Sequence, residues 1–152
     1  MKKKLMFFAA LLALSLSAAD PLPDLDWKVL NGKLANWSGN VEPLPDGGMV
    51  LKGKSCISYS KRKYLVGGQR KARMRFSVQG YGSSIGIYCY GKDTRLLGQF
   101  QERLPNAEDK REFEAVFEIP KTMKGKEVAS FRVFFSSSDG LKLFSIEMYL
   151  EN

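Results

Sequence analysis

The sequence of 152 residues contains no histidine, and this absence excludes several kinds of chemistry. Serine–histidine and cysteine–histidine nucleophilic systems, histidine general bases and histidine-ligated zinc sites all require an imidazole group. Cysteine is scarce as well, with 2 residues, and no cysteine spacing is typical of a zinc site. Any activity of this protein would have to work without imidazole.

Long hydrophobic runs are also missing. The longest covers residues 5–16, whereas a membrane-spanning helix needs roughly 20 apolar residues. Three lysines at positions 2–4 precede this run and small residues at positions 17–19 follow it, which is the order of a secretory signal peptide. We therefore predict a signal peptide over residues 1–19 and a secreted or periplasmic mature chain, residues 20–152, with no membrane span.

Acidic residues are fewer than basic ones, 16 against 24, and the formal net charge is +8. Without the three lysines of the predicted signal peptide, the charge of the mature chain falls to +5, which does not by itself select a partner. A composition of 44% hydrophobic and 26% charged residues is that of an ordinary globular protein, here of one domain. Because the mature chain is predicted to be exported, no nucleic-acid partner is expected.

The mature chain shows short segments of alternating apolar and polar residues and no long segment with the 3.6-residue period of a helix. In residues 70–79, four apolar side chains alternate with basic and polar ones. The same alternation predicts strands over residues 111–120, 129–136 and 144–150, and further strands are expected at residues 48–51, 56–60, 84–90 and 96–100. Asp139-Gly140 predicts a hairpin-like connection between the last two strands.

Eight or nine short strands, each with one buried face, require two sheets packed face to face. The predicted fold is all-β: an antiparallel two-sheet β-sandwich of the jelly-roll type. Trp27 and Trp37 are expected in its core or at the sandwich edge. In an oxidising compartment Cys56 and Cys89 either form a disulfide or remain as two buried thiols.

Several segments, in this order, resemble a known group of proteins: Trp27-Lys-Val-Leu-Asn-Gly, Trp37, Asp46-Gly-Gly-Met-Val-Leu, Lys71-Ala-Arg-Met-Arg-Phe-Ser-Val-Gln-Gly, Val128 to Phe135 and Leu143-Phe-Ser-Ile-Glu-Met-Tyr-Leu-Glu. Over nearly all of the mature chain the order is similar to carbohydrate-binding modules of the galactose-binding-like jelly-roll group, the type often appended to xylanases and cellulases. The resemblance implies a saccharide ligand. Its members commonly carry an aspartate in the last strand, where this sequence has Ser145-Ile-Glu147. This departure weakens the case for a structural calcium ion, and no cofactor is expected.

The candidate ligand-binding residues come from the outward faces of three predicted strands. Tyr88 and Tyr90 alternate with apolar residues, so their rings should point outward and could cover the C–H face of a pyranose. Arginine and glutamine side chains on other outward faces would donate hydrogen bonds. The candidate set is Tyr88, Tyr90, Arg73, Arg75, Gln79, Arg132 and Phe134. The simpler interpretation is that such residues suit any half-exposed strand face.

The carboxylates do not suggest an enzyme. Glu112, Glu114 and Glu118 alternate on what should be a solvated strand face, and they do not form the flanking pair that glycoside hydrolysis requires. No catalytic or metal-ligating residue is predicted. A basic cluster lies beside Tyr59 and Tyr64 and is either a solvated loop or a surface for a polyanionic saccharide: Lys52, Lys54, Lys61, Arg62 and Lys63.

The sequence thus predicts a noncatalytic, secreted carbohydrate-binding domain that holds a polysaccharide or oligosaccharide by aromatic stacking and polar side chains. The alternative is a structural or adhesion-type domain that contacts a protein of the cell envelope.

Overall fold

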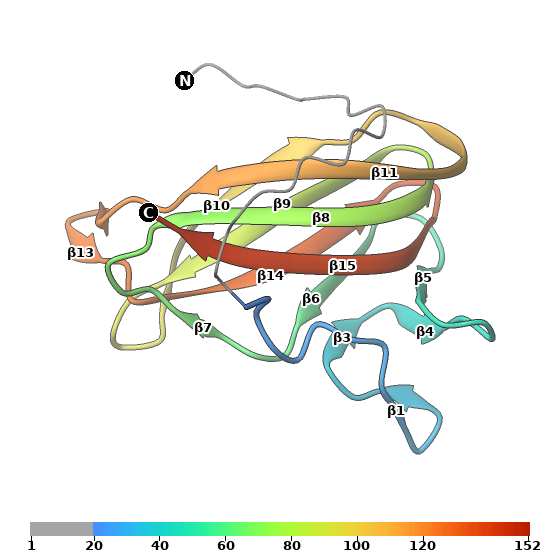
Figure 1. Cartoon of the computed structure of the whole chain (residues 1–152), viewed down its shortest axis with the longest axis horizontal. Coiled ribbons are helices and arrows are strands. Elements are labelled where there is room, and N and C mark those ends of the chain that lie inside the picture. Colours follow the sequence, from blue (N-terminus) through green and yellow to red (C-terminus); the bar gives the residue numbers. More distant parts are fainter. Residues whose placement is uncertain (1–19) are drawn as a thin grey trace.

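The computed structural model describes residues 20–152, and the predicted signal peptide, residues 1–19, lies outside the described residues. Within residues 20–152 the chain forms strands and no helix (Figure 1), and so none that is long and apolar enough to cross a membrane. The strands are β1 (Val29–Leu30), β2 (Lys33–Leu34), β3 (Trp37–Gly39), β4 (Val41–Pro43), β5 (Met49–Leu51), β6 (Cys56–Ser60), β7 (Tyr64–Leu65), β8 (Lys71–Gly80), β9 (Ser83–Tyr90), β10 (Leu96–Arg103), β11 (Ala107–Glu118), β12 (Thr122–Met123), β13 (Lys126–Glu127), β14 (Ser130–Ser137) and β15 (Leu141–Glu151).

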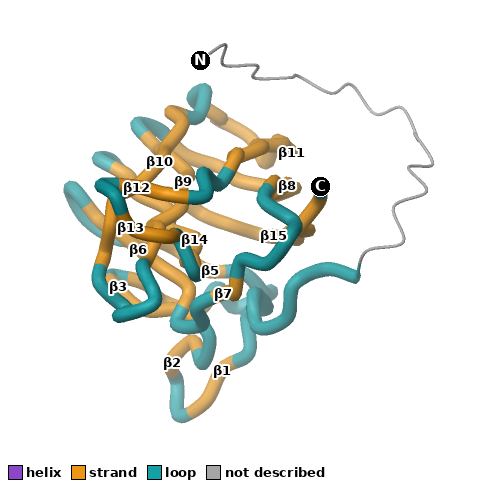
Figure 2. The backbone as a smooth tube through the Cα atoms, turned by 90° about the vertical axis from the view of Figure 1, so that its left-hand side faces the viewer, coloured by secondary structure: helices purple, strands orange, loops and turns teal. Residues whose placement is uncertain are grey.

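Two antiparallel sheets face each other across the core (Figure 2). One, which we call the β14 sheet, has the strand order β10-β9-β14-β6-β3, and β7 also pairs with β14. The other, the β8 sheet, has the order β11-β8-β15-β5-β4. Two short pairs, β1 with β2 and β12 with β13, stand apart from both sheets. The predicted two-sheet β-sandwich is therefore confirmed.

The core is built from the apolar face of each long strand. The alternation in the sequence correctly identifies these residues, because successive side chains of a strand point to opposite sides of the sheet. The following are at most 2% exposed: Ala72, Met74, Phe76 and Val78 of β8, Ile85 and Ile87 of β9, and Phe131, Val133 and Phe135 of β14. Full burial of one such large side chain contributes about 1.5–3 kcal/mol.

Both tryptophans have the structural role expected of them. Trp37 is 2% exposed, and its ring stacks on that of Trp27 with 5.7 Å between the ring centroids. Trp27 is half-buried, and its indole Nε1 donates a hydrogen bond of 3.1 Å to the carbonyl of Phe144. The pair ties the N-terminal segment to the last strand.

Many connections carry the chain from one sheet to the other. The predicted hairpin at Asp139-Gly140 is therefore wrong, because β14 and β15 belong to different sheets and do not pair. Gly140 has a φ of 100°, which suits a turn that takes the chain across the sandwich. The connection from β8 to β9 crosses in the same way. Strands that follow each other across such a connection thus lie in different sheets.

The apolar face expected for the last strand is correct except at its first residue. β15 pairs Leu143 with Val78 and Ser145 with Ser77, which leaves Phe144 as the extra residue of a β-bulge. A bulge reorients the side chain at that position. Phe144 consequently lies half-buried on the outer side of the β8 sheet, outside the core.

Cys56 and Cys89 are free, buried thiols, which decides between the two alternatives that the sequence left open. On β14, Cys89 is opposite Phe131 and Cys56 is opposite Ser137. Six residues along a strand correspond to roughly 20 Å, whereas a disulfide requires Cα atoms within about 7 Å. Burial raises the pKa of the Cys89 thiol to about 11, so this thiol stays protonated and unreactive near neutral pH.

Unfolding the protein in guanidinium without a reductant should release 2 thiols per chain that react at once with a thiol reagent such as Ellman's reagent. The native protein should react far more slowly, because both sulfur atoms are buried. Fewer thiols in denaturant, with the missing ones recovered after reduction, would contradict this part of the structure.

Candidate functional site

The outer face of the β14 sheet gathers aromatic and hydrogen-bonding side chains that point away from the core. The strand register places Tyr88 opposite both Arg132 and Gln99, and Phe134 opposite both Tyr59 and Gly86. Side chains at directly opposite positions on one sheet face are neighbours. Besides a row at one end that contains Leu65, Leu96 and Ser130, the face carries Ser38, Ile57, Tyr59, Ser84, Gly86, Tyr88, Tyr90, Gln99, Gln101, Arg103, Arg132, Phe134 and Ser136.

A stacked pair of rings forms the middle of this face. The rings of Tyr88 and Phe134 lie 4.3 Å apart between centroids, at an interplanar angle of 25°. Phe134 is 2% exposed, whereas Tyr88 is half-buried. The expectation that Phe134 offers its ring to a ligand is therefore corrected. Phe134 supports Tyr88 from below, and Tyr88 presents the accessible surface.

Gly86 makes room for this arrangement. A Cβ atom at Gly86 would lie 2.4 Å from Cζ of Phe134 and 2.3 Å from the carbonyl oxygen of Phe100 on the neighbouring strand. Neither distance is sterically allowed, and the second atom belongs to the backbone and cannot rotate away. The absence of a side chain at this position thus lets the Phe134 ring lie against the sheet.

Arg132 lies between two further tyrosines of the same face. Its guanidinium carbon is 5.6 Å from the ring centroid of Tyr59 and 5.7 Å from that of Tyr90. One guanidinium nitrogen donates a hydrogen bond of 3.1 Å to the carbonyl of Lys61. The Nε atom is buried and has no acceptor within the described part of the chain. Stacked contacts of this kind hold an arginine in place without neutralising its charge.

The phenol of Tyr88 remains protonated near neutral pH. Burial raises its pKa, and the neighbouring phenols of Tyr90 and Tyr59 raise it further. A neutral phenol can both donate and accept a hydrogen bond. The centre of the face therefore combines flat apolar rings with hydroxyl groups that can bond in both directions.

Three of the seven sequence-predicted residues lie elsewhere, on the outer face of the β8 sheet. There Arg73 pairs with Glu114 and, at 2.7 Å, with Glu151. Arg75 also pairs with Glu114, at 3.1 Å. Gln79 donates a hydrogen bond of 2.8 Å to the carbonyl of Glu108. The seven residues therefore do not form one surface: Tyr88, Tyr90, Arg132 and Phe134 share a face, while Arg73, Arg75 and Gln79 are on the opposite side and already bonded.

Sequence reasoning missed residues that belong to the face. Tyr59 and Ile57 are the outward residues of β6, between the buried Cys56, Ser58 and Ser60. The alternation was visible in a strand whose bounds were predicted correctly, so Tyr59 could have been included. Gln99 and Gln101 were harder to find, because the predicted strand ended at position 100 and β10 extends to Arg103.

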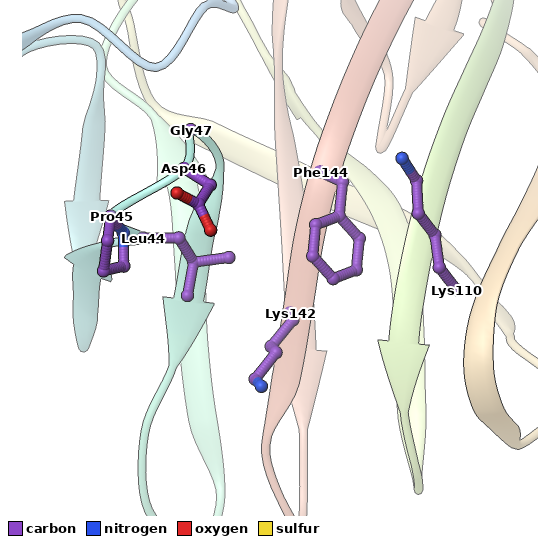
Figure 3. Close-up of a pocket in the computed structure, with 7 residues that line it drawn as sticks. All are labelled: Leu44, Pro45, Asp46, Gly47, Lys110, Lys142 and Phe144. Atoms are coloured by element: carbon purple, nitrogen blue, oxygen red, sulfur yellow. The ribbon is translucent and has the colours of Figure 1, made fainter.

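Two hollows lie outside the centre of this face. One, of about 500 Å³, lies on the β8 sheet beside the turn at residues 44–47, and Figure 3 shows the Phe144 ring between that turn and Lys110. The Nζ atom of Lys110 is 5.2 Å from the ring centroid of Phe144, so a cation already covers the ring. The other hollow, of about 290 Å³, is lined by Ile57, Ser136 and neighbouring serines and extends the outer face of the β14 sheet.

Among residues 20–152 no group of three or more aspartate, glutamate or cysteine side chains is placed to hold a metal ion. At the last strand, Ser145 shares a hydrogen bond of 2.6 Å with Ser77, and Glu147 accepts one of 3.0 Å from Tyr149. Ser145 and Glu147, where the sequence departs from the pattern that it resembles, are therefore each bonded to another side chain of the β8 sheet.

No protein-family model and no curated protein matches this chain. Solved structures match its fold. The CBM22-1 xylan-binding domain of Paenibacillus barcinonensis Xyn10C has a TM-score of 0.62 at 9% identity, over 88% of this chain and 96% of that domain. A family 16 carbohydrate-binding module has a TM-score of 0.51 at 16% identity, over 79% of this chain and 97% of the module. The enzymatically active domain of bacteriophage CBA120 tailspike protein 4 has a TM-score of 0.56 at 14% identity over 82% of this chain, which spans only 21% of that domain.

The chain thus has the jelly-roll fold of carbohydrate-binding modules, as the order of its strands predicted. Two of the matches extend over nearly the whole of a carbohydrate-binding module. At such low identities the likeness establishes the fold. The fold does not determine the ligand, which depends on the side chains that this chain presents.

Replacing Gly86 with alanine should lower the free energy of unfolding by about 1–3 kcal/mol, because the new methyl group overlaps Phe134 and a backbone carbonyl. Gly67→Ala is the matched control, since no atom lies within 4 Å of where its Cβ would be. Urea denaturation of both variants measures the effect. Equal midpoints for the two variants would show that Phe134 does not depend on the space at Gly86.

Proposed function

We propose that this protein binds a saccharide on the outer face of the β14 sheet and does not alter it chemically. The observation that carries the proposal is the stack of Tyr88 on Phe134, with Gln99 and Arg132 directly beside it. A pyranose has an apolar C–H face and a rim of hydroxyl groups. An accessible tyrosine ring suits the first, and amide and guanidinium donors suit the second.

The fold supports this proposal without determining it. Its matches include a domain described as xylan-binding and a carbohydrate-binding module, and both are matched over nearly their full length. In this chain the same sandwich presents aromatic side chains on one sheet. A binding function for that sheet needs no further domain.

The groups on the face support the noncatalytic role that we propose. Hydrolysis of a glycosidic bond needs two carboxyl groups on either side of the bond. Among the described residues, the outward positions of the β14 sheet include no aspartate or glutamate. The arrangement can hold a sugar, and it offers no acid and base to cleave one.

The place of action that we propose is outside the cytoplasm. The basic, apolar and small-residue order of residues 1–19 supports export. Polysaccharides are found in the same compartments.

A second candidate function is docking of a cell-envelope protein. Two exposed leucines favour it: Leu65 is 80% exposed and Leu96 is 53% exposed. The register places Leu96 opposite Tyr90, Tyr90 opposite Ser130, and Ser130 opposite Leu65, so both leucines belong to one row across the β14 sheet. Saccharide binding is preferred because the stacked rings and amides occupy the middle of the face.

Affinity electrophoresis through gels that contain soluble polysaccharides, neutral and acidic, tests the proposal. At least one polysaccharide should retard the protein, and Tyr88→Ala should weaken its binding about tenfold, as loss of a stacking contact worth about 1.4 kcal/mol predicts. Tyr88→Phe keeps the ring and should retain most of the affinity.

Tyr149→Ala is the matched control, because Tyr149 lies on the outer face of the β8 sheet and bonds to Glu147 there. It should migrate like the unchanged protein, with circular dichroism confirming that all variants fold. Unaltered migration in every gel, or an equal loss in Tyr149→Ala and Tyr88→Ala, would reject the proposed site and favour protein docking.

A further inference from the structure

One end of the outer face of the β14 sheet carries two basic side chains close to aromatic rings, and a third basic residue is a near neighbour of one of them in the chain. Arg132 lies between Tyr59 and Tyr90, as described above. The Nζ atom of Lys63 is 4.1 Å from the ring centroid of Tyr90. Lys61 follows β6 directly, and its carbonyl accepts the hydrogen bond from Arg132. We call Lys61, Lys63 and Arg132 the basic end of the face.

No carboxylate of residues 20–152 pairs with these three cations. Lys61 donates to the carbonyl of Leu34 at 3.2 Å, and Lys63 donates to the carbonyl of Thr94 at 3.4 Å. The guanidinium of Arg132 has one hydrogen bond, also to a carbonyl. Carbonyl oxygens satisfy donors, but they leave the positive charges in place.

Two acidic residues near this end of the molecule are already bonded to other cations. Asp24 pairs with Arg62. Asp93 pairs with Lys126 at 3.4 Å and with Arg95 at 3.7 Å. A third, Asp26, accepts a hydrogen bond from the Asn36 amide at 2.7 Å. In the described part of the chain, none of these carboxylates forms an ion pair with the basic end.

The opposite face of the sandwich shows a different arrangement. On the β8 sheet, Arg73 and Arg75 both pair with Glu114, and Arg73 pairs with Glu151 as well. Arg73 and Arg75 on one face are neutralised, whereas Arg132 on the aromatic face is left with its charge. Partly buried charge acts more strongly on a nearby ion than charge in open water.

We propose that the basic end is a subsite for an anionic sugar unit, carrying a carboxylate or a sulfate, within a saccharide whose neutral units lie along Tyr88. This inference rests on the proposed function and specifies its ligand class. The anion would supply the missing counter-charge through charge-assisted hydrogen bonds from Lys63 and Arg132. Its sugar ring would lie beside the phenol of Tyr90.

Isothermal titration at low salt with matched polysaccharides tests the subsite. Polygalacturonate carries carboxylates, and its fully methyl-esterified form has the same backbone without charge. Carrageenan carries sulfates, and agarose oligosaccharides provide the neutral galactan counterpart. At least one anionic polymer should bind about tenfold more tightly than its neutral partner, and the pair that shows the preference identifies the anion as carboxylate or sulfate.

Lys63→Gln should lower the affinity for the anionic polymer roughly three- to tenfold and leave binding of the neutral partner unchanged. Lys63 is half-buried, and its side chain contacts a loop carbonyl and the Tyr90 ring on the surface of the sheet, so this change should not disturb folding. Arg132→Gln is the second variant. It should lower the affinity for the anionic polymer more than Lys63→Gln does, and it should also weaken binding of the neutral partner, because Arg132 lies directly beside Tyr88.

Lys142→Gln is the charge-matched control, because it removes one positive charge from the hollow on the β8 sheet. It should bind both polymers like the unchanged protein. An equal loss in Lys142→Gln and Lys63→Gln would show attraction by net charge alone and overturn the subsite. Tight neutral binding without a preference for the anion would also overturn it while leaving the proposed function intact. No binding to any polymer, charged or neutral, would reject both.

Discussion

The ring of Phe134 lies against the outer face of the β14 sheet, and the candidate site depends on this one contact. It is sterically allowed because Gly86, opposite on the next strand, has no side chain. Phe134 in turn supports Tyr88 at a centroid distance of 4.3 Å. An aromatic side chain on an exposed strand would otherwise sample several rotamers. Here the supporting ring fixes Tyr88 before a ligand arrives, which reduces the entropy lost on binding.

The two outer faces of the sandwich differ in how far their charged side chains are paired and in how much aromatic surface they carry. On the β8 sheet, ion pairs such as Arg73 with Glu114 consume the hydrogen-bonding capacity of the long side chains. Such pairs contribute little to stability when partly exposed, and they leave a face that has few free donors. On the β14 sheet, amides, phenols and unneutralised cations remain available. This contrast is the reason why we propose recognition on the β14 sheet.

Local patterns predicted the strands well, and tertiary arrangement limited what else could be predicted. The alternation of apolar and polar residues correctly predicted the bounds of β6 and the buried face of β8. It could not say which sheet a strand joins, because the crossing connections leave the alternation unchanged. For this reason Arg73 and Arg75 were grouped with Tyr88, from which the sandwich separates them. The bulge at Phe144 and the burial of Phe134 depend on neighbouring strands, and no pattern within one strand contains them.

We propose that the outer face of the β14 sheet, and no other surface, binds the saccharide. The most direct test is to follow the backbone amide signals by NMR while oligosaccharides prepared from each of the matched anionic and neutral polysaccharides are added. The largest saturable shifts of the amide signals should fall on β9, β14 and β6, centred on Tyr88 and Arg132. Shifts confined to β8, β11 and β15, or to the hollow beside Phe144, would contradict it.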